Sequence, residues 1–207
     1  MTVDISSPKR EKEAPRARRD GRERLIEGAR RLLAERGYAG MELRDVAMRG
    51  KAPRGSIYHH FPGGKAQLAV AATEAEGEQV RRALRESMER DGVRATLKRF
   101  GDLFRRRAAE HPELIGCPVA AAALARPEDP ALAAAASAAF ASWEEEIAAA
   151  LQREGVDATR ARGFAGLVVA SIEGALLRAR AAGDDRPLDV AVKGLKAALD
   201  QLLADPA

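Results

Sequence analysis

Apolar residues recur along the chain at the spacing of one face of an α-helix. From Leu25 onward they stand at positions i, i+1, i+4, i+7 and i+8, which is typical of a helix that buries one stripe of side chains. Asp20 is followed three residues later by Glu23, which resembles a capping box, and Gly37 suits the position just after a helix end. The pattern predicts a first helix over residues 20–36.

Two short helical patterns follow, joined by a tight turn. The first covers about two turns of helix over residues 43–49 and is interrupted at Gly50 and Lys51. The second begins at Pro53, because the N–H that proline lacks has no helical partner at that position, and it runs to His60. Two short helices joined in this way are typical of a helix-turn-helix.

The rest of the chain continues in a helical pattern. Helices are predicted over residues 65–91, 93–111, 130–154, 157–182 and 186–204, and a short apolar helix or helical turn over residues 115–125. The last two are apolar on more than one side, so each is expected to pack on its own subunit and on a second surface. Alanine occurs 45 times, against 21 for valine, isoleucine and threonine together, which favours an all-α fold for the 207 residues.

Cysteine usage and apolar run lengths exclude several protein classes. The single cysteine, Cys117, excludes a disulfide framework and a multi-thiolate zinc site. The longest uncharged runs, residues 114–125 and 130–143, are shorter than the roughly 18–20 residues that span a bilayer. The first residues are polar and charged, unlike a signal peptide. We therefore expect a cytoplasmic protein with no membrane contact.

Charge is unevenly distributed along the chain. Residues 1–65 carry 16 Lys and Arg against nine Asp and Glu, whereas residues 66–207 carry 19 against 22. A basic first part indicates a partner with phosphates, either nucleic acid or an anionic membrane, although a disordered basic tail is an alternative. We divide the chain into a flexible basic arm (1–17), a helix-turn-helix domain (18–65) and a larger domain (66–207). Whether the arm contacts DNA stays open.

The second short helix carries the side chains expected to contact DNA. Arg54 stands at its N-terminus, where a major-groove helix meets guanine O6 and N7. Gly55 adds no bulk where backbone and phosphate approach, and Ser56 and Tyr58 carry hydroxyls that suit phosphate oxygens. Lys65 opens the next helix, where its charge and the free N–H groups both favour a phosphate.

Enzyme chemistry finds little support in the sequence. The histidines are His59, His60 and His111, without a Glu-x-x-His pair for a di-metal site. The Gly-Gly-Lys at residues 63–65 lacks the other residues of a P-loop, and a Gly-x-Ser-x-Gly elbow is absent. We expect no catalytic residues, no metal and no cofactor.

Most of the few aromatic residues lie in the second part of the chain, among alanines. Aromatic residues at helical spacing are more often core residues than pocket residues, but large side chains between small ones can leave a cavity for an apolar ligand between helices. We expect Cys117 to be a small buried side chain, with a redox or covalent sensor as the alternative. Glu144–Glu146 is interpreted as a solvated face, unless one carboxylate turns inward toward a cationic ligand. The candidate ligand-binding residues are Phe100, Phe104, Cys117, Phe140, Trp143, Phe164 and Ser171.

The same residues resemble a known family. The segments Gly37-Tyr38, Leu43-Arg44-Asp45-Val46-Ala47 and Pro53-Arg54-Gly55-Ser56-Ile57-Tyr58-His59-His60-Phe61, followed by Lys65, resemble the N-terminal domain of TetR/AcrR-family transcriptional regulators over residues 20–75. Residues 52–56, 61–65 and 116–120 look like the LmrA/YxaF-like branch. The resemblance implies a homodimer of about nine helices per chain, DNA binding by helices two and three, and a C-terminal pocket whose ligand releases the operator.

The resemblance also implies residue roles. Arg44, Ser56, Tyr58 and Lys65 match phosphate-contacting positions, and Arg54 and His59 match groove-facing ones; with Lys51, Pro53 and Gly55 they form the predicted DNA-binding set. The chain departs from the family where Met41 and Glu42 replace a usual Thr and Ser. It departs again at Lys51, where the turn glycine usually stands. Either the helix before it ends sooner, or Lys51 is left-handed at a cost of roughly 1–2 kcal/mol.

Taken together, the sequence predicts a dimeric transcriptional regulator, most simply a repressor of double-stranded operator DNA released by a largely apolar small molecule. Helices 157–182 and 186–204 are expected to form the dimer interface. One alternative is an effector-independent DNA-binding protein whose C-terminal domain only dimerises. Another is a helical ligand-binding protein or enzyme that has kept the fold without DNA recognition.

Overall fold

The protein is described by a computed structural model, which covers residues 15–53, 55–110 and 116–205; side chains are described for residues 21–53, 55–103 and 116–205. All regular structure in these residues is α-helical, which confirms the predicted fold class. In chain order the helices are α1 (Pro15–Arg36), α2 (Leu43–Arg49), α3 (Ser56–His60), α4 (Gly64–Glu110), α5 (Pro118–Ala123), α6 (Pro130–Arg153), α7 (Ala158–Ala182) and α8 (Arg186–Ala204).

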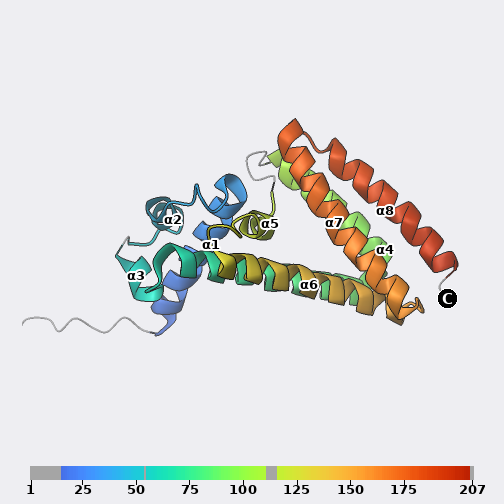
Figure 1. Cartoon of the computed structure of the whole chain (residues 1–207), viewed down its shortest axis with the longest axis horizontal. Coiled ribbons are helices and arrows are strands. Elements are labelled where there is room, and N and C mark those ends of the chain that lie inside the picture. The colour runs from blue at the N-terminus through green and yellow to red at the C-terminus, as the bar shows by residue number, and fades with distance from the viewer. Residues whose placement is uncertain (1–14, 54, 111–115, 206–207) are drawn as a thin grey trace, which may run out of the picture.

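The helices form two connected parts (Figure 1). α1, α2 and α3 cluster at one end of the molecule, with α5 beside α1. α4 first runs beside α6 from this cluster to the other end and then turns back, so that its second part lies behind α7 in Figure 1. α7 packs on α6 and α8, and α8 also packs on α4. We call the cluster of α1, α2 and α3 the head, and the group of α4, α6, α7 and α8 the body.

The head is held by the apolar stripe that the sequence predicts. Leu25 and Leu32 of α1 are fully buried, and they share a core with Met41, Ile57 and Phe61. α1 begins at Pro15, so the start predicted from a capping box at residue 20 is wrong, and residues 15–17 are helical rather than part of an arm. Residues 1–14 lie outside the described part of the chain.

Two glycines allow α1 and α2 to approach closely. A Cβ atom on Gly50 would lie 2.7 Å from the carbonyl oxygen of Arg24, and one on Gly28 would lie 2.8 Å from the carbonyl oxygen of Val46. Any larger residue at either position would push the helices apart. Gly50 is therefore required by packing, although its own φ of −73° is ordinary.

α4 consists of two helices joined at a glycine. Gly92 has a φ of 76° and a ψ of 172°, a conformation that favours glycine. The break lies where the sequence predicts it, and counting both parts of α4 gives nine helical segments in the described residues. The backbone N–H of Val93, which begins the second part, donates to the Glu154 carboxylate at the end of α6 at 3.0 Å.

Side-chain caps set the limits of the later helices. Asp129 accepts a hydrogen bond from the N–H of Leu132 at the start of α6, and Asp157 accepts from the N–H groups of Thr159 and Arg160 at the start of α7. Gly183, with a φ of 68°, ends α7. The predicted limits of α6, α7 and α8 are confirmed to within a residue, whereas α5 is shorter than the predicted helix over residues 115–125.

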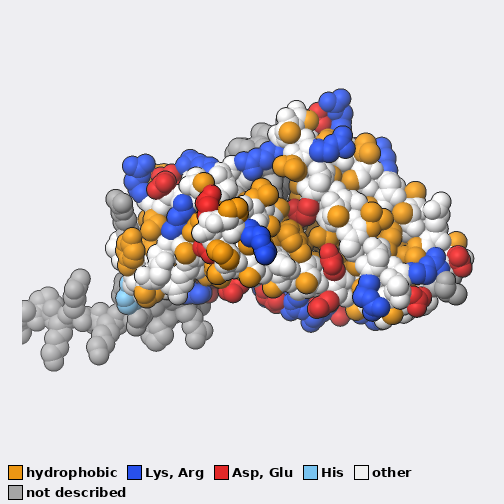
Figure 2. Space-filling view, viewed as in Figure 1, with side chains coloured by type: hydrophobic (Ala, Val, Ile, Leu, Met, Phe, Trp, Pro, Cys, Tyr) orange, Lys and Arg blue, Asp and Glu red, His pale blue; other side chains and the backbone are white. Residues whose placement is uncertain are grey.

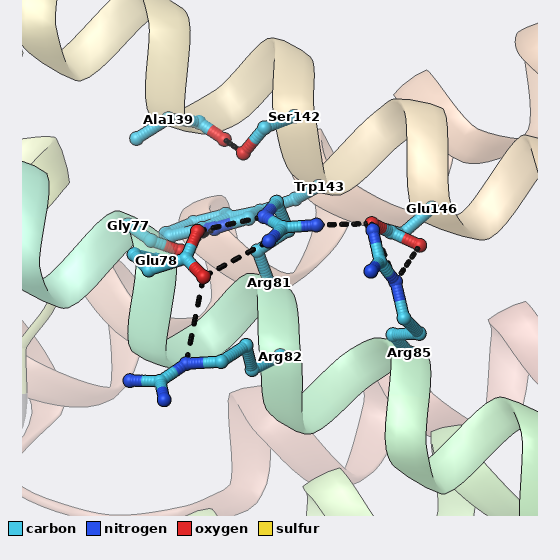
Figure 3. A network of polar contacts seen from close by, with 9 residues as sticks. All are labelled: Gly77, Glu78, Arg81, Arg82, Arg85, Ala139, Ser142, Trp143 and Glu146. Carbon is cyan, nitrogen blue, oxygen red and sulfur yellow. Dashed lines mark hydrogen bonds and ion pairs between the residues drawn. The ribbon is translucent and has the colours of Figure 1, made fainter.

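A polar network joins α4 to α6 (Figure 3). The indole N–H of Trp143 donates to the carbonyl oxygen of Gly77 at 2.9 Å, and Arg81 and Arg85 both donate to Glu146. These guanidinium groups lower the pKa of the Glu146 carboxyl. Glu146 therefore does not belong to a solvated face, as the sequence suggested, but ties the two long helices together.

Among the described residues, none of the helices has the length and apolar character needed to cross a membrane.

Candidate functional site

α2, α3 and the turn between them carry most of the predicted DNA contacts. Ile57 is buried and anchors α3 on the head. Exposed members of the predicted set are Arg44, Lys51, Pro53, Gly55, Tyr58 and His59, whereas Ser56 and Lys65 are half-buried. Arg54, the predicted base-reading residue, lies outside the described residues. The exposed members have the surface access that DNA contact requires.

Lys51 takes the left-handed conformation in the turn. Its φ is 47°, the one positive φ among the described non-glycine residues. α2 ends at Arg49, one residue before Gly50. Both alternatives raised by the displaced glycine thus hold together: the helix ends early and Lys51 is left-handed, at a cost of roughly 1–2 kcal/mol.

The start of α3 differs from the prediction. Pro53 does not open the helix; its carbonyl oxygen accepts from both the N–H and the hydroxyl of Ser56, at 2.9 and 2.6 Å. α3 begins at Ser56 itself. Pro53 therefore closes the turn before α3, and the Ser56 hydroxyl helps to hold that turn.

Lys65 fastens the beginning of α4 to the loop after α1. Its ammonium donates to the carbonyl oxygen of Ala39 at 3.2 Å and lies 4.7 Å from the centroid of the Tyr38 ring. The side chain remains partly accessible beside the first turn of α4, where the helix dipole also favours an anion.

The departures at Met41 and Glu42 have different consequences. Met41 is fully buried in the core of the head, so it fills space instead of contacting a partner. Glu42 is exposed and takes the N-cap position of α2, but its side chain makes no capping hydrogen bond. The usual hydroxyls at this helix start are therefore replaced by a core residue and an exposed carboxylate that does not cap the helix.

A cavity of about 180 Å³ lies in the body, between α4, α6, α7 and the start of α5. Its walls are mostly apolar, with Leu84, Met88, Ile147 and Val168 among them. In Figure 2 an acidic side chain is visible among hydrophobic ones in the angle between α6 and α7. The volume of the cavity is below the roughly 300–1,000 Å³ of pockets for drug-sized ligands, so the cavity can hold only a small molecule.

Part of the predicted pocket set lines this cavity. Phe100, Cys117 and Trp143 are among its walls. Phe140 does not line the cavity; its ring packs edge-on against the Trp143 ring, with 5.3 Å between the two ring centroids. Phe164 is a buried core residue. Ser171 lies in a different groove, and the side chain of Phe104 is outside the described residues.

Two carboxylates that the sequence analysis missed also line the cavity. Glu76 is buried and paired with Arg30 of α1, whose Nε lies 2.6 Å from Glu76 Oε2. Glu173 of α7 is hydrogen-bonded to the Cys117 thiol, while its Oε2 is buried without a hydrogen-bond partner. The signal for Glu173 was available: it is the one acidic residue in the sequence of α7, within an apolar stripe.

Burial perturbs the titration of both groups at this contact. It raises the pKa of Glu173 to about 7, and the Glu76 carboxylate raises it too, whereas the hydrogen bond with Cys117 acts in the opposite direction. Burial also raises the pKa of the Cys117 thiol, with Glu173 adding to the effect. The thiol therefore stays protonated at neutral pH, which favours its interpretation as a buried side chain over that of a reactive sensor.

Two arginines connect the cavity walls to α1. Arg30 on α1 holds Glu76, and Arg180 on α7 donates to the carbonyl oxygen of Ala34, in the last turn of α1, at 2.6 Å. Gly116, another wall residue, lies against the same carbonyl: a Cβ atom on it would be 3.0 Å from the Ala34 oxygen. The cavity walls thus contact α1, so a movement of these walls would displace α1 and the helices packed on it.

An open groove of about 400 Å³ runs between α7 and α8 on the outside of the body. Leu167 and Val190 line it and are 48% and 65% exposed. Small residues, Gly174 and Gly194, lie between them. This is the second apolar side that the sequence predicts for the last two helices.

The fold and the exposed helix pair define a helix-turn-helix protein with a helical C-terminal domain. Residues 25–72 match the family model described as bacterial regulatory proteins of the tetR family, and residues 93–194 match that of the LmrA/YxaF-like C-terminal domain of transcriptional regulators. The chain belongs to the TetR family of transcriptional regulators.

Full-length relatives agree with this assignment. The chain is 32% identical to the HTH-type transcriptional regulator LmrA of Bacillus subtilis, over 82% of this chain and 91% of LmrA. It is 34% identical to an HTH-type transcriptional regulator of Mycobacterium tuberculosis, over 84% and 92% of the two chains. A crystal structure of a TetR transcriptional regulator from Chloroflexus aurantiacus is similar, with a TM-score of 0.72, 32% identity and coverage of 90% and 97%.

The family settles the broad class of the protein. It is a DNA-binding transcriptional regulator of a family whose members bind operator DNA and dimerise. The family and these relatives are regulators and not enzymes, which confirms the expectation that the chain has no catalytic role.

Proposed function

We propose that this regulator is a homodimeric repressor that a small, largely apolar molecule releases from its operator. The observation that carries the proposal is that residues of the cavity walls are bonded to α1 or in direct contact with it. Wall residues Glu76 and Gly116 reach α1 through Arg30 and through direct contact, and α7, which supplies another wall, reaches it through Arg180. Because its partner is DNA, its place of action is the cytoplasm.

A ligand in such a cavity acts through the difference in its affinity for two arrangements of the body. α7 and α4 both line the cavity and both bond to α1. A ligand that separates these walls moves the attachment of the head, and so changes the distance between the two recognition helices of a dimer. Two helices spaced about 34–36 Å apart fit successive major grooves, and another spacing does not.

In this proposal α3 enters the major groove, with Arg54 and His59 toward the bases. Arg44, Lys51, Ser56, Tyr58 and Lys65 lie toward the phosphates, and Pro53 and Gly55 shape the backbone between them. The exposure of Arg44, Tyr58 and His59 supports these roles.

The first experiment selects DNA fragments with the purified protein and footprints the recovered sequence, together with the DNA upstream of its own gene. We expect a protected palindrome. Arg54→Ala should relax base preference at one position of each half-site, at a cost of roughly 1–3 kcal/mol. Arg44→Ala should weaken binding to all sequences alike and reduce the salt slope by about 1.

Arg153→Ala, at the exposed far end of α6, is the matched control and should leave both properties unchanged. If the protein protects no palindrome at low salt, the operator-binding proposal is wrong. If it binds its operator and no small molecule ever releases it, the effector-independent alternative replaces the repressor mechanism described above.

A further inference from the structure

The described walls of the cavity contain acidic side chains but no basic one. Among the described residues that line it, two are acidic, Glu76 and Glu173, and none is Lys, Arg or His. The other polar wall residues, such as Gln79 and Thr96, are neutral. The environment of a ligand is therefore apolar with an acidic spot.

The two carboxylates differ in what satisfies them. Glu76 is neutralised from outside the cavity, because Arg30 of α1 donates two hydrogen bonds to its Oε2. Glu173 has no such partner: the Cys117 thiol is a weak donor, and Oε2 is buried with no hydrogen bond at all. A buried carboxylate oxygen normally has a partner, so this one marks a place where a donor is missing.

We propose that the cavity binds a small organic cation, an ammonium group on an aromatic or aliphatic body, with the ammonium paired with the carboxylate of Glu173. The proposal rests on the effector cavity proposed above and names the chemistry of its ligand. An ammonium group supplies both the missing donor and the missing charge. The Phe100 and Trp143 rings in the walls suit the apolar body and also attract a cation.

The same walls disfavour anions. A carboxylate or phosphate ligand would bring its negative charge beside the Glu173 carboxylate, which no cation among the described wall residues offsets. A neutral ligand would fill the volume but would leave the Glu173 carboxylate without a charge partner. The volume of about 180 Å³ suits a molecule with a single ring.

Three probes of nearly equal size separate these cases: benzylammonium, benzyl alcohol and benzoate. Binding to the free, full-length protein is measured by titration calorimetry at pH 8, where Glu173 is ionised. We expect benzylammonium to bind at least about tenfold more tightly than benzyl alcohol, because a hydrogen bond to a charged group is the stronger kind. Benzoate should bind most weakly.

Glu173→Gln keeps the shape of the side chain and removes its charge, so it should abolish the preference for benzylammonium over benzyl alcohol. Glu145→Gln, which removes an equal charge from the exposed side of α6, should keep that preference. Thermal unfolding of both variants checks that they remain folded.

Equal affinity of the wild-type protein for benzylammonium and benzyl alcohol would overturn the proposal, and so would a preference that survives in Glu173→Gln. Binding of none of the probes would also count against it. Since these titrations contain no DNA, a chain that binds benzylammonium but protects no operator would refute the proposed repressor function and leave the ligand class standing.

Discussion

The carboxylate of Glu173 lowers the stability of the folded protein but suits the binding of a ligand. Its buried Oε2 has no hydrogen-bond partner, and an unsatisfied buried polar group costs roughly 1–3 kcal/mol of folding free energy. The other wall residues on this part of α7, Val169, Ile172 and Leu176, are apolar, so an apolar side chain at position 173 would match the wall. A carboxylate with a perturbed pKa in the wall of a cavity is typical of a binding function.

The free-energy cost of the buried Glu173 carboxylate should make the stability of the folded protein depend on pH. The folded protein has a pKa of about 7 at Glu173, against an ordinary value of 4.5, so it holds the proton more tightly than the unfolded chain. Stability from this group is fully present below about pH 4.5 and is lost as the pH rises through about 7. Glu173→Gln does not titrate, so its free energy of unfolding relative to wild type should rise by up to about 3 kcal/mol between pH 5 and pH 8.

Urea unfolding at the two pH values measures this difference. Glu145→Gln is the control for the loss of one carboxylate, and its difference from wild type should change much less. A Glu173→Gln difference that is the same at both pH values would show that the Glu173 carboxyl is not desolvated in the folded protein.

At the scale of elements, the turn between α2 and α3 satisfies two demands with adjacent residues. Gly50 lets the end of α2 meet the backbone of α1 near Arg24, where no Cβ fits. The left-handed residue of the turn then falls on Lys51, which is strained there. The position of the glycine is explained by helix packing, and the strain by the turn.

This strain can be measured with two substitutions of Lys51. Lys51→Gly and Lys51→Ala both remove the charge, but only glycine relieves the left-handed strain. We expect Lys51→Gly to be about 1 kcal/mol more stable than Lys51→Ala in urea unfolding. If Lys51 contacts a phosphate, both variants should reduce the salt slope of operator binding by about 1. Equal stabilities of the two variants would contradict the left-handed turn.

The long helices were predictable because their apolar periodicity and their capping residues can be recognised within a short stretch of sequence. Asp157 and Gly183 mark the ends of α7 in the sequence as clearly as in the structure. The starts of α1 and α3 were not predicted correctly, because a proline can open a helix, as Pro15 does, or precede one, as Pro53 does. The choice depends on tertiary contacts of the turn, which a helical pattern does not contain.

The cavity was predictable only in part, for a similar reason. Aromatic content indicated the right domain, and Phe100 and Trp143 do line the cavity, but Phe140 packs behind Trp143 instead. Which side of a helix faces a void depends on how its neighbours cover it. The sequence of α7 singles out Glu173 as its one acidic residue, but that this residue lines a cavity follows only from the packing of α4, α6 and α7.

At the scale of the whole molecule, α7 meets every part of the proposed mechanism. Glu173 is on its cavity side, Arg180 bonds to the end of α1, and Leu167 lines the outer groove with α8. A ligand, the head and a second subunit would thus all act on one helix. A rigid helix shared by three sites is a simple way to couple them.

The dimer interface gives the prediction at this scale. We expect the groove between α7 and α8 to be covered by the same groove of a second copy, as a twofold interface requires. Leu167→Glu then places two like charges in one apolar interface, which should weaken dimerisation at least about 100-fold, measured by analytical ultracentrifugation. Leu124→Glu, at the exposed leucine that follows α5 and lies outside the groove, is the control and should stay dimeric.

The same variant links assembly to DNA binding. A Leu167→Glu monomer retains its head, so it should still bind DNA weakly through one half-site, but it loses the second half-site and with it the affinity for a palindrome. Electrophoretic mobility shifts with a full operator and with a half-site separate the two effects. A Leu167→Glu protein that remains dimeric and binds the palindrome as wild type does would place the dimer interface elsewhere, and the exposed groove would then need a different occupant.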